Sequence, residues 1–277
     1  MVFSTLVSTA DLADHLDGWR VFDCRHDLTK PELGESQYRA AHIPGALFAS
    51  LDRDLSAPKT GANGRHPLPD PHVFAEWLSR SGVSASDQVV CYDAANGATA
   101  ARLWWLLRWV GHDAVAVLDG GLAKWTAEGR PVTSEIPRPK AGKFAARPRS
   151  DMAVDVAGIA KTLRKRVLLD ARAPARYRGE QEPIDPVAGR IPGALNRFNM
   201  DNVRGDGRFK SPEDLKRDLQ QVLGGRAPGE VVHYCGSGVA ACHNLLAMEL
   251  AGLSGGKLYA GSWSEWQADP KRPREKG

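Results

Sequence analysis

The chain has 277 residues, and its 37 lysines and arginines against 33 aspartates and glutamates give a formal net charge of +4. Such a mild charge, without a dense basic face, does not indicate a nucleic acid partner. The length is about twice that of an ordinary ~100–150-residue domain, and the composition is that of a globular protein, so we expect two domains.

No secretory or membrane segment is expected. Residues 1–13 lack a basic start followed by a sustained apolar run. The apolar segment 103–110 is too short to cross a bilayer and contains Arg108. We therefore expect a cytoplasmic protein without a membrane partner, in which this segment is a core helix.

Apolar runs alternate with helical patterns along the chain. In the first half, strands are predicted at 20–24, 88–92 and 114–118, and helices at 10–16, 71–81 and 99–110. In the second half, strands are predicted at 167–170, 230–234 and 257–259, and helices at 211–223 and 240–250. This alternation predicts an α/β fold with mainly parallel sheets covered by helices on both faces.

The two halves are copies of one pattern. HIPGAL at 42–47 recurs as RIPGAL at 190–195, and FDCR at 22–25 recurs as LDAR at 169–172. Recurrence in the same order and at similar offsets indicates a duplicated fold. We predict a first domain at 1–135, a Pro-rich linker at 136–150 and a second domain at 151–277.

Cys235 is the most informative residue. It follows the predicted strand 230–234 and precedes Gly-Ser-Gly and a helix. The glycines allow backbone N–H groups to curl around one point, and the helix start adds partial positive charge. This environment favours a thiolate or a persulfide anion. The alternative is an inert core cysteine, which the glycines make less favourable.

The loop sequence CGSGVAA resembles the active-site loop of the rhodanese superfamily, in particular that of the 3-mercaptopyruvate sulfurtransferases. The resemblance implies two tandem rhodanese-like domains and a persulfide on Cys235. Ala240 stands where the usual loop has threonine, and the basic residues that thiosulfate-type relatives place after the cysteine are absent here. The loop residues that the resemblance assigns to substrate binding are Gly236, Gly238, Val239, Ala240 and Ala241.

The first copy has Asp93 at the position of Cys235. A carboxylate cannot carry a persulfide, so we predict a catalytically silent first domain, which in tandem relatives helps to wall the active cleft. Alternatively Asp93 caps the following helix, and both statements can hold together.

Two arginines are candidates for the substrate's anionic group. The resemblance assigns this role to Arg176, since a guanidinium matches a carboxylate; the alternative is a surface arginine paired with Glu180 or Glu182. The animal-type enzymes carry a second arginine downstream, where this chain has Asp185. Arg190, in place of the family's histidine, either adds positive charge to the site or replaces a structural hydrogen bond.

The resemblance also implies a relay of serine, histidine and aspartate. These residues map onto Ser237, His66 and Asp52, which would polarise the substrate carbonyl or shuttle a proton. The alternative is a loop histidine and a turn aspartate without a catalytic task.

The other cysteines carry weaker signals. Cys24 and Cys91 are expected to be buried in strands, and Cys242 either packs in its helix or resolves an oxidised Cys235. Without Cys-x-x-Cys spacing, neither a metal nor a cofactor is expected.

The predicted reaction moves a sulfur atom from a small-molecule donor, 3-mercaptopyruvate, through the cysteine persulfide to a thiophilic acceptor such as thioredoxin, another thiol or cyanide. The alternatives are a thiosulfate sulfurtransferase and a persulfide carrier or redox module without turnover. A phosphatase is disfavoured because no arginine ends the loop after Cys235.

Overall fold

The computed structural model describes residues 2–163 and 165–277. The chain forms two compact units. Unit 1 consists of Met1–Ala57, Pro69–Arg149 and Arg204–Phe209, and unit 2 consists of Pro58–Leu68, Ser150–Val203 and Lys210–Gly277. A short segment of each half is thus part of the other half's unit, which the repeat pattern did not predict.

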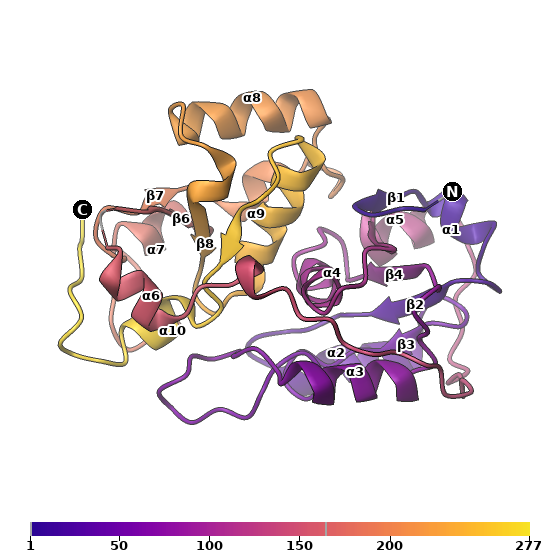
Figure 1. The fold of residues 1–277 in the computed structure, drawn as a ribbon. Helices are drawn as coiled ribbons and strands as arrows, with labels where there is room; N and C mark the ends of the chain where they lie inside the picture. Colours follow the sequence, from indigo (N-terminus) through magenta and orange to yellow (C-terminus); the bar gives the residue numbers. More distant parts are fainter. Residues whose placement is uncertain (1, 164) are drawn as a thin grey trace. The chain divides into compact units, whose positions relative to one another are not determined.

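Unit 1 contains a five-stranded, all-parallel sheet with the order β1-β5-β4-β2-β3. Its strands are β1 (Leu6–Val7), β2 (Arg20–Asp23), β3 (Leu47–Phe48), β4 (Val89–Tyr92) and β5 (Val115–Leu118). Its helices are α1 (Thr9–Ala13), α2 (Pro31–Ala40), α3 (Pro71–Arg80), α4 (Ala100–Trp109) and α5 (Gly121–Ala127) (Figure 1).

Helices cover both faces of this sheet. Successive residues of a strand point to opposite faces, so neighbouring residues of β2 show which helices pack on each face. Val21 of β2 packs in one core cluster with Leu12 of α1 and Trp125 of α5. Its neighbour Phe22 faces the other way and meets Trp77 of α3, with ring centroids 5.4 Å apart. The predicted two-faced α/β arrangement is therefore confirmed.

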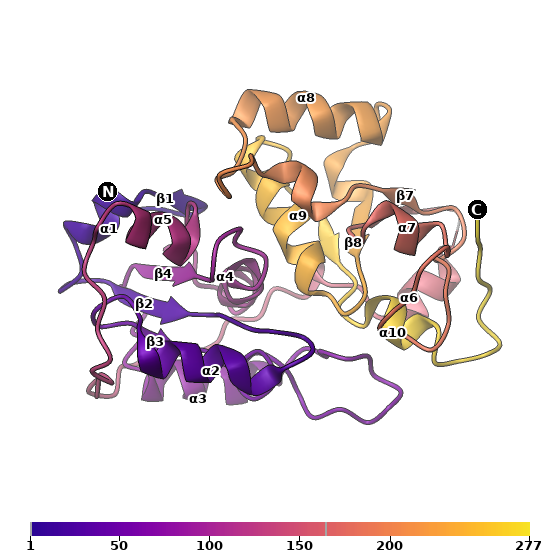
Figure 2. The same ribbon diagram turned by 180° about the vertical axis from the view of Figure 1, so that it is seen from behind.

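Unit 2 contains a four-stranded parallel sheet with the order β7-β6-β8-β9. Its strands are β6 (Val167–Asp170), β7 (Leu195–Asn196), β8 (Val231–Tyr234) and β9 (Lys257–Leu258). Its helices are α6 (Val156–Lys161), α7 (Pro174–Tyr177), α8 (Pro212–Leu223), α9 (Val239–Leu250) and α10 (Ser262–Trp266), with short 3-10 turns at Ser150–Met152, Asn199–Asn202 and Pro228–Glu230 (Figure 2).

The duplication extends to buried polar contacts. In unit 1, Arg25 forms an ion pair with Asp23, and the hydroxyl of Tyr92 accepts a hydrogen bond from the Ile43 amide. In unit 2 the same contacts recur. Arg172 pairs with Asp170 at 2.7 Å, and the Tyr234 hydroxyl accepts from the Ile191 amide. In both units the tyrosine that ends the strand before the loop thus contacts the first residue of the IPGA motif, and the arginine also donates to a carbonyl just before that motif, of Ala41 in unit 1 and of Gly189 in unit 2.

The predicted linker is part of unit 1 as far as Arg149. The Gly142 amide donates to the Ser79 carbonyl, and the Arg147 amide donates to that of Val110. None of the helices in the described ranges is both long and apolar enough to cross a membrane.

Candidate active site

Cys235 lies directly after β8 and before α9, at the carboxyl edge of the unit 2 sheet. Its Sγ accepts hydrogen bonds from the amides of Ser237, at 3.4 Å, and Gly238, at 3.1 Å. Its own amide donates to Oγ of Ser262 at 3.1 Å. The sulfur is therefore held by amide dipoles that stabilise negative charge, and the side chain is only 3% exposed.

Gly238 is required by the shape of this loop. Its φ is +80°, and a Cβ at this position would lie 2.6 Å from the Ala260 carbonyl oxygen. A side chain would therefore be strained by the backbone conformation and would also clash. The next residues, Val239, Ala240 and Ala241, form the first turn of α9, so their amides belong to the positive end of the helix.

The structure brings two members of the predicted relay together. His66 Nδ1 lies 2.8 Å from Ser237 Oγ, and both residues are buried. His66 reaches the loop because Pro58–Leu68 is part of unit 2. Asp52 lies in a turn after β3 in unit 1, and its role stays a prediction.

Arg176, in α7, forms ion pairs with Glu182 at 2.6 Å and Asp185 at 3.1 Å. Pairing with Glu182 was the alternative considered for this arginine. Burial disfavours ionisation of Glu182, but the hydrogen bonds from Arg176 and from backbone amides outweigh it and lower the pKa of Glu182. The pairing does not remove Arg176 from the loop, since its guanidinium also lies against Gly236.

Sequence reasoning missed Arg65. Its Nη1 lies 2.5 Å from Asp185 Oδ1, and its Nη2 would be 2.9 Å from a Cβ built on Gly236. The only local signal was a basic residue next to His66. Asp185, which the sequence offered in place of a second arginine, thus contacts an arginine from a distant segment.

Arg190 is engaged by the C-terminal residues. Its guanidinium pairs with Glu275, donates to the Gly277 carbonyl, and lies 4.5 Å from the centroid of the Tyr177 ring. These contacts correspond to the structural alternative; a role in substrate binding stays a prediction.

The Cys242 thiol donates to the Gly238 carbonyl at 3.1 Å and is fully buried in α9. This contact holds the Gly238 end of the Cys235 loop against α9. Cys91 is buried in β4, as expected, and Cys24 is buried too but lies directly after β2 and not within it.

The corresponding loop of unit 1 is filled by Asp93. Its carboxylate accepts hydrogen bonds from the amides of Ala95, Gly97, Thr99 and Ala100 and from the Thr99 hydroxyl. The loop still gathers amides around one anion, and that anion is the protein's own side chain. Asp93 therefore caps the helix start, as its alternative interpretation proposed.

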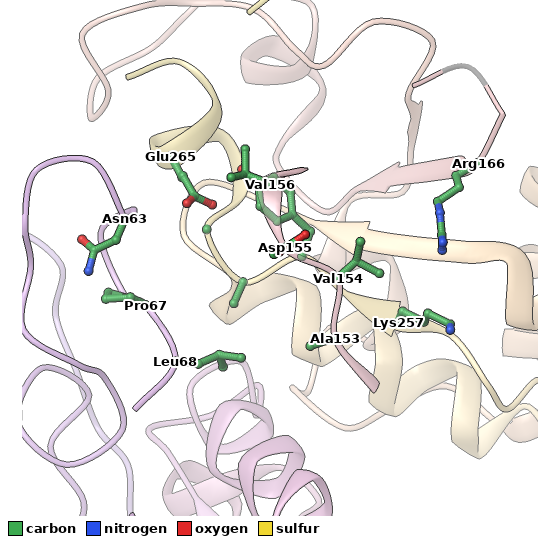
Figure 3. Close-up of a pocket in the computed structure, with 13 residues that line it drawn as sticks. Asn63, Pro67, Leu68, Ala153, Val154, Asp155, Val156, Arg166, Lys257 and Glu265 are labelled. Carbon is green, nitrogen blue, oxygen red and sulfur yellow. The ribbon is translucent and has the colours of Figure 1, made fainter. Parts of the chain in front are cut away.

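A cavity of about 570 Å³ lies elsewhere on unit 2. Figure 3 shows residues on two sides of it, which include Asn63, Pro67 and Leu68 on one side and Val154, Asp155 and Lys257 on the other. Cys235 and Ser237 are not among its lining residues.

Comparison with known proteins agrees with this geometry. A family model described as the Rhodanese-like domain matches residues 8–128 and 156–269. A Pseudomonas aeruginosa protein described as a probable 3-mercaptopyruvate sulfurtransferase is 51% identical over 257 residues, covering 91% of this chain and 90% of that protein. The thiosulfate sulfurtransferase of Cricetulus griseus is 34% identical over 295 residues, covering 98% and 95%. The solved structure of the Leishmania major 3-mercaptopyruvate sulfurtransferase superposes with a TM-score of 0.87 at 31% identity, covering 98% of this chain and 75% of that chain.

The fold and the site together define a tandem α/β protein with one cysteine-bearing amide loop and one carboxylate-filled loop. The chain belongs to the rhodanese family, as the two matched segments and the relatives establish.

Proposed function

We propose that this protein is a sulfurtransferase that takes a sulfur atom from 3-mercaptopyruvate and passes it on through a persulfide at Cys235. The observation that carries the proposal is the pair of amides, from Ser237 and Gly238, directed at Cys235 Sγ. The names of the relatives at 51% and 31% identity support the choice of donor.

In the first step the Cys235 thiolate attacks the sulfur of 3-mercaptopyruvate. An S–S bond forms and the C–S bond breaks, with its electron pair passing to the enolate of pyruvate, which then takes a proton at carbon. The loop amides stabilise the thiolate before the attack and the persulfide anion after it.

Ser237 and His66 are the proposed proton-handling pair. With Oγ and Nδ1 2.8 Å apart, the hydroxyl can donate its proton to the developing enolate oxygen while the imidazole, protonated at Nδ1, donates a proton to Oγ in its place. Asp52 is proposed as the third member, to orient the imidazole.

In the second step a thiophilic acceptor attacks the outer sulfur of the persulfide and regenerates the Cys235 thiolate. We propose thioredoxin, a low-molecular-weight thiol or cyanide as the acceptor, in the cytoplasm. The sulfur is transferred as a neutral atom with six valence electrons, so no external oxidant or reductant is required for the first step.

Mass spectrometry before and after addition of 3-mercaptopyruvate tests the proposal. We expect the peptide with Cys235 to gain the mass of one sulfur atom, pyruvate to appear in equal amount, and the acceptor to remove the gain. The Cys235→Ser variant should show none of these changes, and Cys242→Ser should show all of them. A gain of sulfur on another cysteine alone would refute the assignment.

Thiosulfate is the second candidate donor, because two arginines lie against Gly236 and a thiosulfate sulfurtransferase is among the relatives. A higher kcat/KM for thiosulfate than for 3-mercaptopyruvate would reverse the choice. If the persulfide forms but is not turned over with thioredoxin, with a low-molecular-weight thiol or with cyanide, a persulfide carrier would instead be favoured.

A further inference from the structure

The loop after β4 shows how this backbone binds a two-pronged anion. Asp93 Oδ1 accepts from the amides of Ala95, at 3.2 Å, and Gly97, at 2.9 Å. Asp93 Oδ2 accepts from the amides of Thr99, at 2.9 Å, and Ala100, at 3.3 Å, and from the Thr99 hydroxyl at 3.0 Å. One oxygen is therefore bound by the loop, and the other by the start of α4.

The loop after β8 repeats the first of these two positions. Cys235 Sγ accepts from the amides of Ser237 and Gly238, at 3.4 and 3.1 Å, as Asp93 Oδ1 does from the loop of unit 1. Gly238 and Gly97 are both left-handed, with φ +80° and +81°, and each directly precedes the start of the helix. The two glycines therefore align the loops residue by residue from that point onward.

The second position falls on the first turn of α9. Counted from the left-handed glycine, Ala240 stands where unit 1 has Thr99, and Ala241 stands where it has Ala100. The first amides of a helix have no acceptor within the helix itself, and no other described residue accepts from these two. Both amides are thus available to a second atom attached to the sulfur of Cys235.

The two helix starts differ by one hydroxyl. Thr99 gives its anion an amide and a hydroxyl donor, whereas Ala240 can give only its amide. Ala240 is half-buried, so a larger side chain can be placed there without displacing the core. The outer sulfur of a persulfide on Cys235 therefore lacks a donor that the corresponding anion of unit 1 has.

We propose that residue 240 sets how strongly the transferred sulfur is held, and that alanine at this position favours release of the sulfur to the acceptor. The inference deepens the proposed function and rests on it. The outer sulfur corresponds to Asp93 Oδ2, and Cys235 Sγ corresponds to Asp93 Oδ1.

A donor at residue 240 acts on one form of the protein only. Without the extra sulfur, the charge lies on Cys235 Sγ, which the amides of Ser237 and Gly238 hold. In the persulfide, the charge lies on the outer sulfur, next to residue 240. A hydroxyl there stabilises the persulfide and leaves the thiolate unchanged.

This difference bears on the transfer step. The acceptor thiolate attacks the outer sulfur and forms a new S–S bond, while the electron pair of the broken S–S bond returns to Cys235 Sγ. The outer sulfur leaves with its negative charge as part of the acceptor persulfide, so it loses its donors in the protein. A hydroxyl at residue 240 therefore stabilises the starting state of this step, and alanine avoids that stabilisation.

Two variants of the same shape test the inference. Ala240→Thr adds the hydroxyl, and Ala240→Val has a methyl group in its place. Each protein is loaded with 3-mercaptopyruvate, freed of excess donor and mixed with reduced glutathione, and mass spectrometry follows the extra sulfur on Cys235 over time. Ala240→Thr should lose the sulfur about 10-fold more slowly than Ala240→Val, as for a hydrogen bond to a charged group. Equal rates, or a faster loss in Ala240→Thr, overturn the inference.

The loading step separates a new donor from a displaced loop. Single-turnover release of pyruvate should be no slower in Ala240→Thr than in Ala240→Val, because the hydroxyl stabilises the product of this step. A slower release would show that the loop is displaced and would also overturn the inference. If Ala240→Thr fails to fold, Ala240→Ser supplies the same hydroxyl and should lose sulfur more slowly than the parent; a parental rate overturns the inference. Wild-type protein that gains no sulfur from 3-mercaptopyruvate would refute the proposed function itself, whereas normal gain with equal loss in the two variants refutes this inference alone.

Discussion

Replacing Asp93 by alanine should destabilise unit 1 strongly, although this residue carries no sulfur. Its Oδ1 accepts from the amides of Ala95 at 3.2 Å and Gly97 at 2.9 Å. Its Oδ2 accepts from the Thr99 amide at 2.9 Å, the Thr99 hydroxyl at 3.0 Å and the Ala100 amide at 3.3 Å. The Asp93→Ala variant leaves all of these donors without their acceptor.

The magnitude follows from the burial of the loop. Asp93 is 5% exposed, and Gly97 and Ala100 are also buried. A hydrogen bond to a charged group contributes about 1.5–3 kcal/mol, and a buried donor without an acceptor costs about 1–3 kcal/mol. These effects overlap within one loop, and water can reach the half-buried Ala95 and Thr99. We therefore expect the free energy of unfolding of unit 1 to fall by about 3–5 kcal/mol.

Hydrogen exchange resolves this effect by unit, because a chain of two units need not unfold in one step. Amides of β4 and α4 should lose protection in Asp93→Ala, while those of β8 and α9 keep theirs. Asp113→Ala is the control, since Asp113 is 57% exposed and its pair with Arg149 should contribute at most about 1 kcal/mol. Equal protection of β4 and α4 in the two variants would refute the reasoning.

Other predictions concern unit 2. Ser237→Ala removes the 2.8 Å contact with His66 and should lower kcat for 3-mercaptopyruvate about 100-fold. The rate at which iodoacetamide alkylates Cys235 should change less than about 3-fold in the same variant. An equal loss of kcat and of alkylation rate would indicate that the loop is distorted. Burial lowers the pKa of His233 to about 3 from its ordinary 6.5, so the unfolded chain binds this proton at higher pH than the folded chain does. The free energy of unfolding should therefore fall by up to about 1.4 kcal/mol per pH unit below pH ~6.5. Urea unfolding at several pH values measures this slope, which should be smaller in the His233→Leu variant. An identical slope in the variant would exclude His233 as the source of the pH dependence.

Local patterns were sufficient for most of the long elements of the fold, although the ten-residue helix α2, Pro31–Ala40, was not predicted. The apolar run predicted at 230–234 is β8, Val231–Tyr234, and the helical pattern at 240–250 is α9, Val239–Leu250. The strands β1, β3 and β7 were not predicted, since each has two residues and cannot display a period; β9 is equally short and was predicted only from the run at 257–259. They form only because a longer neighbour provides the edge to which they bind.

Some residues of the candidate site could likewise be predicted from local sequence, and others could not. The glycines around Cys235 are a local signal, since the backbone itself requires them, and they predicted the amide loop. His66 was assigned through the family resemblance, not through its own surroundings in the sequence. Arg65 had neither signal. Its place depends on a close approach of Gly64 to Gly261, where a Cβ on Gly64 would lie 2.8 Å from the Gly261 carbonyl oxygen, and such tertiary contacts leave no periodic trace.

The loops that follow β4 and β8 share one backbone design but have different roles. Each directs amides at the side chain that follows its central strand, and each contains a left-handed glycine, Gly97 with φ +81° and Gly238 with φ +80°. Asp93 has two oxygens, which accept from the amides of Ala95, Gly97, Thr99 and Ala100, so these donors are occupied by the protein's own carboxylate. Within the described part of the chain, the Cys235 sulfur accepts from the amides of Ser237 and Gly238, and it can extend by one atom while the charge remains beside the helix start. An aspartate in this amide loop therefore stabilises the fold but cannot carry a transferred sulfur, whereas a cysteine keeps the anion site available to the sulfur that it carries.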